Sequence, residues 1–127
     1  MDGGAEYVNC SGQDFAQALF QLVKNGIEAA AASPEPRWVR VDAHVDLARS
    51  ELVVRVSDSG AGLDVEQLAT LFVPFHGSAT TTGRLGLGLS TVKDLVTKNA
   101  GQVEYVPFEA HTTFQMRFGL VSTEPTP

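Results

Sequence analysis

Two glycine-containing motifs constrain the fold of this chain most strongly. The first, Asp-Ser-Gly-Ala-Gly-Leu at residues 58–63, follows a strand-like apolar run at 52–56. The second, Gly-Arg-Leu-Gly-Leu-Gly-Leu at 83–89, leads into an amphipathic segment at 87–99. A carboxylate in a pocket can accept a hydrogen bond from an amine, glycines let backbone approach a ligand, and a helix start offers free N–H groups to phosphate. Together the motifs predict a purine nucleotide site, which neither would predict alone.

Size and composition indicate a single domain. The chain has 127 residues and is 43% hydrophobic, which is enough for one core and unlike a disordered composition. No apolar run approaches the roughly 20 residues of a membrane helix. The acidic start at residues 1–6 lacks the basic and apolar regions of a secretory signal. We therefore expect a domain that does not contact a membrane directly.

Cysteine usage and charge narrow the partners further. The single cysteine, Cys10, excludes an internal disulfide framework and fits a reducing cytosol. A formal net charge of −6 argues against a general nucleic-acid or anionic-membrane binder. A small polyanion stays possible, because local N–H groups and a metal can override a weak global field. These features predict a cytoplasmic domain that binds no nucleic acid.

The pattern of apolar residues predicts one long helix near the start. Residues 11–14 (Ser-Gly-Gln-Asp) offer N-cap chemistry, and apolar or small residues then recur at helical spacing. Pro34 and Pro36 should end this helix before residue 33. The apolar positions are Phe15, Ala18, Leu19, Leu22, Gly26, Ala29 and Ala30.

The remaining elements are predicted mostly as hairpins. We expect a short strand at 6–10, a hairpin of 38–45 with 51–56, and a final hairpin of 102–106 with 113–118. A short helix at 65–72, a flexible loop at 73–83, and a helix at 87–99 capped by Gly101 as a C′ glycine separate the hairpins.

This order predicts an α+β two-layer sandwich: a mixed, mainly antiparallel sheet with about three helices on one face. We expect a flexible N-terminus at 1–5, the domain at 6–120 and a disordered tail at 121–127. A doubly wound dinucleotide fold is disfavoured because strictly alternating βαβ units are missing, and no P-loop pattern occurs.

Four ordered motifs make the chain resemble a known family. Asn25 late in a helix, Asp58-x-Gly60-x-Gly62, Phe72 and Phe75 before a lid, and Gly86-x-Gly88 opening a helix resemble the N, G1, F and G2 boxes of the GHKL ATPases. The segment 85–93 is most similar to the catalytic, ATP-binding domain of bacterial sensor histidine kinases. The resemblance covers residues 6–118 and implies a Bergerat-type fold with a flexible ATP lid.

The resemblance implies roles for the residues of the first motif and the helix before it. Asp58 would accept a hydrogen bond from the adenine amino group, while Gly60 and Gly62 let backbone approach the base and Leu63 lines the floor of its pocket. Asn25 would be the Mg²⁺ ligand that links the metal to the phosphates, which suits a cation that takes oxygen ligands and keeps several waters.

The resemblance also places residues at the phosphate end. Gly86, Leu87 and Gly88 open a helix whose free N–H groups would face the phosphates. Arg84 stands where the family more often has glycine, and could stiffen the lid or place a cation on the phosphates. Thr112 aligns with the threonine of a late Gly-Thr pair that supports the contact between aspartate and adenine, although His111 replaces its glycine.

Two more departures from the family bear on activity. Gln21 stands where hydrolysing relatives carry a general-base glutamate, and an amide cannot act as a base, so we expect slow ATP hydrolysis. No other catalytic residue is assigned. Glu28 stands where many kinases carry a phosphate-binding lysine, and its charge has the wrong sign for that role.

Taken singly, these residues have simpler interpretations. An aspartate before a glycine often caps a turn, and an asparagine on a polar helix row is usually solvated. Phe72 and Phe75 fit core packing, and His44, His76 and His111 are interpreted as structural or surface residues, since none has the spacing of a metal site. Only the combination of motifs favours the nucleotide site.

The resemblance implies a kinase domain that uses ATP and Mg²⁺ and delivers the γ-phosphoryl group to a histidine on a separate dimerisation domain. A response regulator would be the next partner. We expect the chain to belong to a longer sensor, whose membrane anchoring stays open. Two alternatives remain: a free-standing serine kinase of the anti-sigma type, and a degenerate docking module without catalysis.

Overall fold

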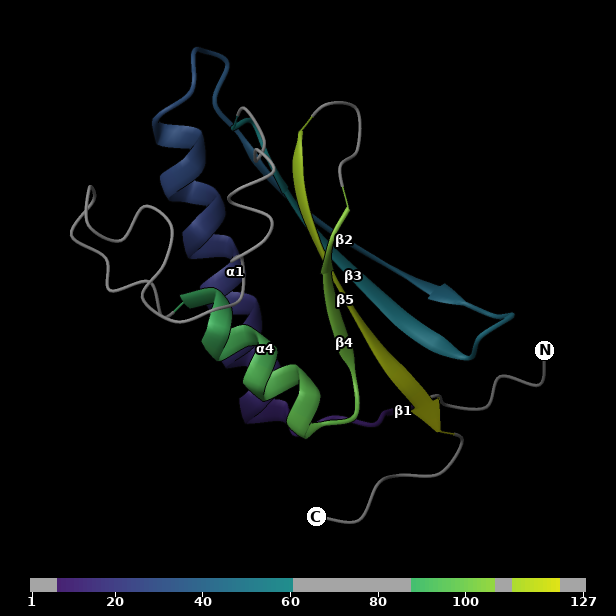
Figure 1. Cartoon of the computed structure of the whole chain (residues 1–127). Helices are drawn as coiled ribbons and strands as arrows, with labels where there is room; N and C mark the ends of the chain where they lie inside the picture. The colour runs from purple at the N-terminus through teal and green to yellow at the C-terminus, as the bar shows by residue number, and fades with distance from the viewer. Residues whose placement is uncertain (1–6, 61–87, 107–110, 122–127) are drawn as a thin grey trace.

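The protein folds into two layers, with helices on one face of a sheet. The computed structural model describes residues 7–60, 88–106 and 111–121. The two helices of this part lie on the same side of a five-stranded sheet (Figure 1), which confirms the predicted α+β class. The predicted helix at 65–72, the loop at 73–83 and both predicted flexible termini, except residue 121, lie outside the described residues. The elements are β1 (Tyr7–Val8), α1 (Gly12–Ala31), β2 (Val39–Asp46), β3 (Glu51–Asp58), α4 (Gly88–Lys98), β4 (Gln102–Tyr105) and β5 (Thr112–Val121).

Every strand pairing among the described residues is antiparallel. The order is β1-β5-β3-β2, and β4 pairs with β5 as well. Both predicted hairpins form: β2 pairs with β3, and β4 pairs with β5. In the register of β3 and β5, Asp58 lies opposite Thr112. The sheet therefore brings the first motif next to a residue more than fifty positions away.

Helix α1 begins and ends where the sequence predicts. The Ser11 side chain caps it by accepting a hydrogen bond from the backbone N–H of Asp14 at 3.3 Å. The helix ends at Ala31, before the two prolines. The helix buries one residue per turn over four turns, and these are Ala18, Leu22, Gly26 and Ala30. This narrow row of mostly small side chains lets the sheet approach the helix closely.

The end of α4 corrects one prediction. Ala100, rather than Gly101, adopts the left-handed conformation, with φ of 59°. Its N–H donates to the Thr97 carbonyl and that of Gly101 to the Val96 carbonyl, which together form a Schellman motif. Gly101 is required for space instead, because a Cβ atom there would lie 2.6 Å from the carbonyl oxygen of Arg117.

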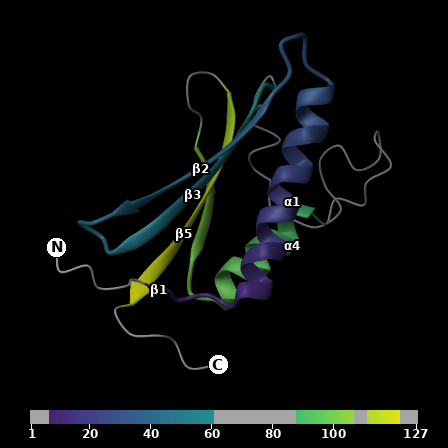
Figure 2. The ribbon, with the colours of Figure 1, turned by 180° about the vertical axis from the view of Figure 1, so that it is seen from behind.

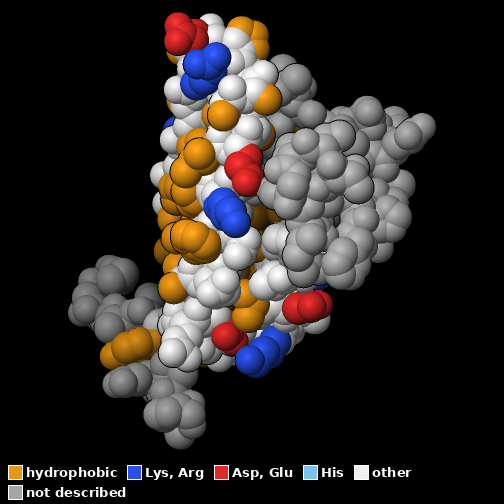
Figure 3. All heavy atoms as spheres, turned by 90° about the vertical axis from the view of Figure 1, so that its left-hand side faces the viewer, with side chains coloured by type: hydrophobic (Ala, Val, Ile, Leu, Met, Phe, Trp, Pro, Cys, Tyr) orange, Lys and Arg blue, Asp and Glu red, His pale blue; other side chains and the backbone are white. Residues whose placement is uncertain are grey.

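The core lies between the helices and the strands β3 and β5. Its buried apolar side chains are Ala18, Leu22, Val54, Val56, Val92, Val96, Phe114, Met116 and Phe118. Hydrophobic side chains also line the face shown in Figure 3, and Phe20 and Ile27 of α1 are more than half exposed. No helix within the described part of the chain is long and apolar enough to cross a membrane.

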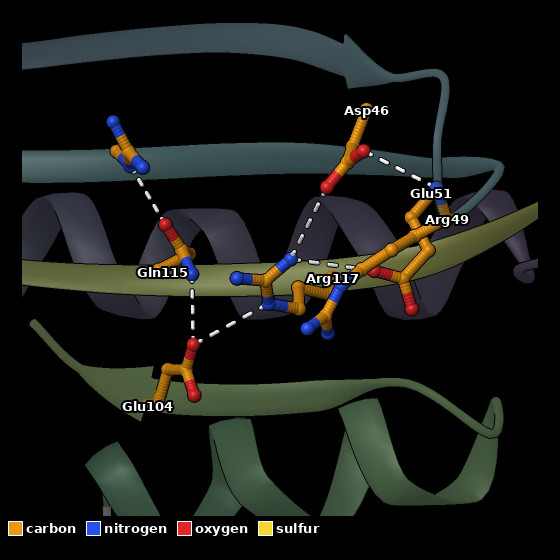
Figure 4. Close-up of polar contacts among 7 residues, drawn as sticks. Asp46, Arg49, Glu51, Glu104, Gln115 and Arg117 are labelled. Carbon is orange, nitrogen blue, oxygen red and sulfur yellow. Dashed lines mark hydrogen bonds and ion pairs between the residues drawn. The ribbon is translucent and has the colours of Figure 1, made fainter.

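The face of the sheet that points away from the two helices carries a polar network across four strands (Figure 4). Arg117 of β5 contacts Glu51 at 3.3 Å, Glu104 at 3.4 Å and Asp46 at 4.0 Å. Gln115 donates to Glu104 at 2.8 Å and accepts from Arg55 at 2.7 Å. These contacts connect β2, β3, β5 and β4, so the face away from the helices is held together by ion pairs and charge-assisted hydrogen bonds.

Candidate functional site

The centre of the candidate site is Asp58, the last residue of β3. Its side chain is only 1% exposed and lies on the helix-facing side of the strand, in line with Val54 and Val56. Oδ1 accepts a 2.7 Å hydrogen bond from the backbone N–H of Gly60. A carboxylate at this depth is expensive unless a specific interaction requires it, so Asp58 marks a candidate binding site rather than ordinary packing.

Small residues of α1 make room for this carboxylate. A Cβ atom on Gly26 would lie 3.6 Å from Cβ of Asp58, so the strand end rests directly on the helix backbone. One turn further, a Cβ atom on Gly60 would lie 3.2 Å from Cβ of Ala29. Larger side chains at these helix positions would push the strand end away. The sequence pattern placed Gly26 and Ala29 on the apolar face but gave no sign of this contact.

The surroundings of Asp58 perturb its acidity. Burial raises the pKa of its carboxyl group, while the Gly60 N–H and the nearby charge of His111 act in the opposite direction. The ionised form is therefore disfavoured by its environment and only partly compensated. A ligand that donates a hydrogen bond to this carboxylate would supply the missing stabilisation.

The start of β5 supplies the wall beside Asp58. Thr112 lies directly opposite Asp58 in the register and is 4% exposed, so both side chains stand on the same face of the sheet. Its neighbour His111 contacts the ring of Trp38 edge-on, with centroids 4.8 Å apart. The sequence alone interprets His111 as a structural or surface residue and gives no sign of the effect of its charge on Asp58. Only the pairing of β3 with β5 reveals that effect.

A second set of hydrogen bonds fixes the segment that follows Asp58. The N–H of Ser59 donates to the Trp38 carbonyl at 3.0 Å, and the Trp38 N–H donates to Oγ of Ser59 at 3.1 Å. Oγ of Ser59 also lies 3.1 Å from Oγ of Ser33, just beyond α1. The end of α1, the start of β2 and the end of β3 are thus tied together around the carboxylate.

The other end of the site lies where α1 meets the start of α4. A Cβ atom on Gly88, the first residue of α4, would lie 3.2 Å from Oε1 of Gln21. Asn25 is one helical turn beyond Gln21 and directly precedes Gly26. From Gln21 to Ala29 the helix rises by about 12 Å. Helix α1 therefore connects the buried carboxylate at one end with the start of α4 at the other.

Several predicted site residues cannot be placed in this geometry. Gly62, Leu63, Arg84, Gly86 and Leu87 lie outside the described residues. In the ranges that are described, no three His, Cys, Asp or Glu side chains cluster as a metal site. Among the described residues, Asn25 carries an amide oxygen of the type that Mg²⁺ accepts as a ligand.

The chain is similar in sequence to sensor kinases. It is 36% identical over 92 residues to the autoinducer 2 sensor kinase/phosphatase LuxQ of Vibrio parahaemolyticus, covering 69% of this chain and 11% of that protein. It is 26% identical over 110 residues to the sensory histidine kinase/phosphatase NtrB of Salmonella typhimurium, covering 82% and 31%. The chain thus spans a third or less of the length of these relatives.

Solved structures share the fold. The nucleotide-free catalytic domain of the histidine kinase ThkA superposes with a TM-score of 0.72 at 24% identity, covering 87% of this chain and 68% of that one. The mycobacterial sensor histidine kinase MprB superposes with a TM-score of 0.74 at 22% identity, covering 94% and 81%. Residues 11–122 match the family described as histidine kinase-, DNA gyrase B- and HSP90-like ATPase. The predicted resemblance is confirmed, and the chain belongs to this ATPase family.

Proposed function

We propose that this chain is the ATP-binding catalytic domain of a two-component sensor histidine kinase, with Asp58 as its adenine-recognising residue. The observation that carries the proposal is the buried carboxylate of Asp58, with its Oδ1 held by the Gly60 N–H. An ionised acceptor in this place matches the exocyclic amine of adenine. Guanine presents a carbonyl oxygen there, which would meet the carboxylate acceptor to acceptor.

The nucleotide would extend along α1 from the base at Asp58 toward the start of α4. The N–H groups at the start of α4 would then face the phosphates, as helix N-termini commonly do. Asn25 lies between the two ends and would supply an amide oxygen to Mg²⁺. The metal would neutralise phosphate charge, while the protein positions the reacting group.

Phosphoryl transfer would use an acceptor outside this chain. In this proposal the γ-phosphoryl group passes to a histidine on a dimerisation domain and then to a response regulator in the cytoplasm. Gln21 lies against Gly88 at the phosphate end, where a carboxylate could activate water but an amide cannot. Slow hydrolysis together with competent binding is the expected property of the isolated chain.

The test is calorimetric titration of the chain with Mg-ATP and Mg-GTP. We expect measurable binding of ATP and at least tenfold weaker binding of GTP, since the carboxylate discriminates by hydrogen-bond direction. Equal affinity for the two purines would contradict the adenine assignment. Binding of neither nucleotide, with no thermal stabilisation by Mg-ATP, would favour the docking module instead. Repeating the ATP titration with a chelator separates the contribution of the metal.

A further inference from the structure

The outer edge of β2 combines open backbone groups with exposed apolar side chains. Within the described part of the chain, β2 pairs only with β3 (Figure 2). Val41 and Val45 are 48% and 46% exposed, and Leu47 just beyond the strand is 88% exposed. Long open edges with apolar side chains are sites of strand pairing unless they are protected.

The hydrogen-bond pattern shows which residues of β2 could pair outward. The Ser59 N–H donates to the Trp38 carbonyl, which makes Trp38 and Ser59 a hydrogen-bonded pair at the end of the hairpin. Hydrogen-bonded and non-hydrogen-bonded pairs alternate along an antiparallel ladder. Val41, Ala43 and Val45 therefore direct their N–H and C=O groups away from β3, toward the open edge.

The sequence of β2 is complementary to itself when read in the opposite direction around Ala43. Two antiparallel copies centred there place Val41 opposite Val45 and Arg40 opposite Asp46. Asp42 then lies opposite His44, and Ala43 lies opposite its own copy. Like side chains thus meet on the apolar face, and opposite or hydrogen-bonding partners meet on the polar face.

The backbone pattern and the extent of side-chain pairing together favour this register. The three outward-directed residues become hydrogen-bonded pairs, and Arg40 and Asp42 fall in the non-hydrogen-bonded pairs, where side chains come closest. Centring on Val41 or Val45 also keeps the backbone pattern, and the first places Arg40 opposite Asp42, but only residues 39–43 or 44–46 of β2 then pair, instead of 40–46. Centring on Asp42 places that carboxylate opposite its own copy, and centring on His44 places Asp42 opposite Asp46. A two-fold interface of this kind uses the same patch on both partners.

We propose that the outer edge of β2 pairs with β2 of a second copy of this chain, antiparallel and centred on Ala43. The sheets of the two copies become continuous, and the exposed valines pack across the junction. The proposal depends on the edge strand alone and not on nucleotide binding. A failure of the nucleotide assignment would leave it standing, and its own failure would not affect that assignment.

Sedimentation equilibrium of the chain over a range of concentrations tests the association. We expect the average mass to rise from one copy toward two. Ala43→Pro removes an outward N–H without removing a bond to β3, so it should weaken dimerisation at least about tenfold. Ala43→Val retains the N–H and should retain the dimer. A mass of one copy at every concentration, or a dimer that survives Ala43→Pro, overturns the proposal.

Charge reversal tests the polar face of the same interface. Arg40→Glu would place a carboxylate opposite Asp46 at both ends of the junction, so the dimer should weaken about tenfold or more. Lys98→Glu changes the net charge equally but lies on α4, where its side chain is 70% exposed, and should not alter dimerisation. Equal effects of the two reversals would contradict the assigned edge.

Disulfide trapping tests the register. In a Cys10→Ser background, Ala43→Cys should cross-link to its own copy under mild oxidation, since the two Cα atoms would lie about 5.5 Å apart. Leu47→Cys is more exposed but would lie about 27 Å from its copy, and should not cross-link. Cross-linking of both at the same rate would overturn the register.

Discussion

The backbone N–H of Gly60 donates a 2.7 Å hydrogen bond to Oδ1 of Asp58, two residues before it. This contact fixes the carboxylate at the end of β3 and explains why a glycine follows the aspartate at this spacing. A Cβ atom on Gly60 would lie 2.7 Å from the same oxygen, closer than side-chain carbons approach. The spacing of aspartate and glycine in this motif therefore fixes the position of the carboxylate as well as forming a turn.

Gly60→Ala should lower ATP affinity by about tenfold or more, because the new methyl group displaces the carboxylate oxygen. Titration calorimetry measures this change. Gly12→Ala is the matched control, since a Cβ atom at Gly12 meets nothing within 4 Å. Unchanged affinity in Gly60→Ala would show that the carboxylate position does not matter for binding.

The raised pKa of Asp58 predicts a specific pH dependence of stability. Between the usual carboxyl pKa of 3.8 and the raised value, the folded state keeps a proton that the unfolded state releases. Stability therefore falls as the pH rises through this window. Asp58→Asn removes the cost of burying an ionised carboxylate, so the unliganded variant should melt at a higher temperature than the wild type at neutral pH.

Thermal unfolding of both proteins from pH 3.5 to pH 7 measures the effect. The difference in Tm should be smallest at the acid end and grow with pH. A variant that melts lower at pH 7 would show that the ionised carboxylate stabilises the unliganded fold.

Local sequence signals predicted the parts of the fold that depend on local chemistry. The Ser11 cap of α1 could be predicted because its side-chain oxygen accepts a hydrogen bond from an N–H only three residues further along the chain. The β2–β3 hairpin could likewise be predicted, because strand-like patterns of apolar residues lie on either side of a short turn. Asp58 and Gly60 could be singled out because both belong to one motif, and the structure brings them into contact.

Contacts between distant segments could not be read in this way. The effect of His111 on Asp58 depends on the register of β3 and β5, and the approach of Gly26 to Asp58 depends on how α1 crosses the sheet. Nothing in the sequence distinguishes Arg117 from an ordinary strand residue, yet it forms ion pairs with carboxylates from three other strands. Ala100 takes a conformation that residue type alone would assign to its glycine neighbour.

Asn99→Ala should destabilise the fold by about 1–3 kcal/mol. Its side chain accepts from the Ser11 N–H at 2.9 Å and donates to Asp14 at 2.9 Å, so it ties the end of α4 to the start of α1. Urea denaturation measures the loss. Lys98→Ala removes only an exposed ion pair with Asp14 and should cost less than about 1 kcal/mol. Equal losses of stability in the two variants would contradict the role of the Asn99 amide.

Arg117→Met should destabilise the fold by about 1–3 kcal/mol, because it leaves Glu51, Glu104 and Asp46 without their shared cation. Added salt should reduce the difference in unfolding free energy between this variant and the wild type, because it screens the repulsion among the remaining carboxylates. Glu35→Gln breaks a highly exposed ion pair with Arg37 and should have little effect in the same denaturation series. An Arg117→Met variant as stable as Glu35→Gln would show that the network contributes nothing.

Calorimetric titration of Asp58→Asn with Mg-ATP, beside the wild type, tests whether this carboxylate recognises adenine. We expect at least a tenfold loss of ATP affinity, about 1.5–3 kcal/mol for a charged acceptor, in a variant that remains folded. Wild-type affinity in the Asn variant would contradict the assignment of Asp58 as the adenine-recognising residue.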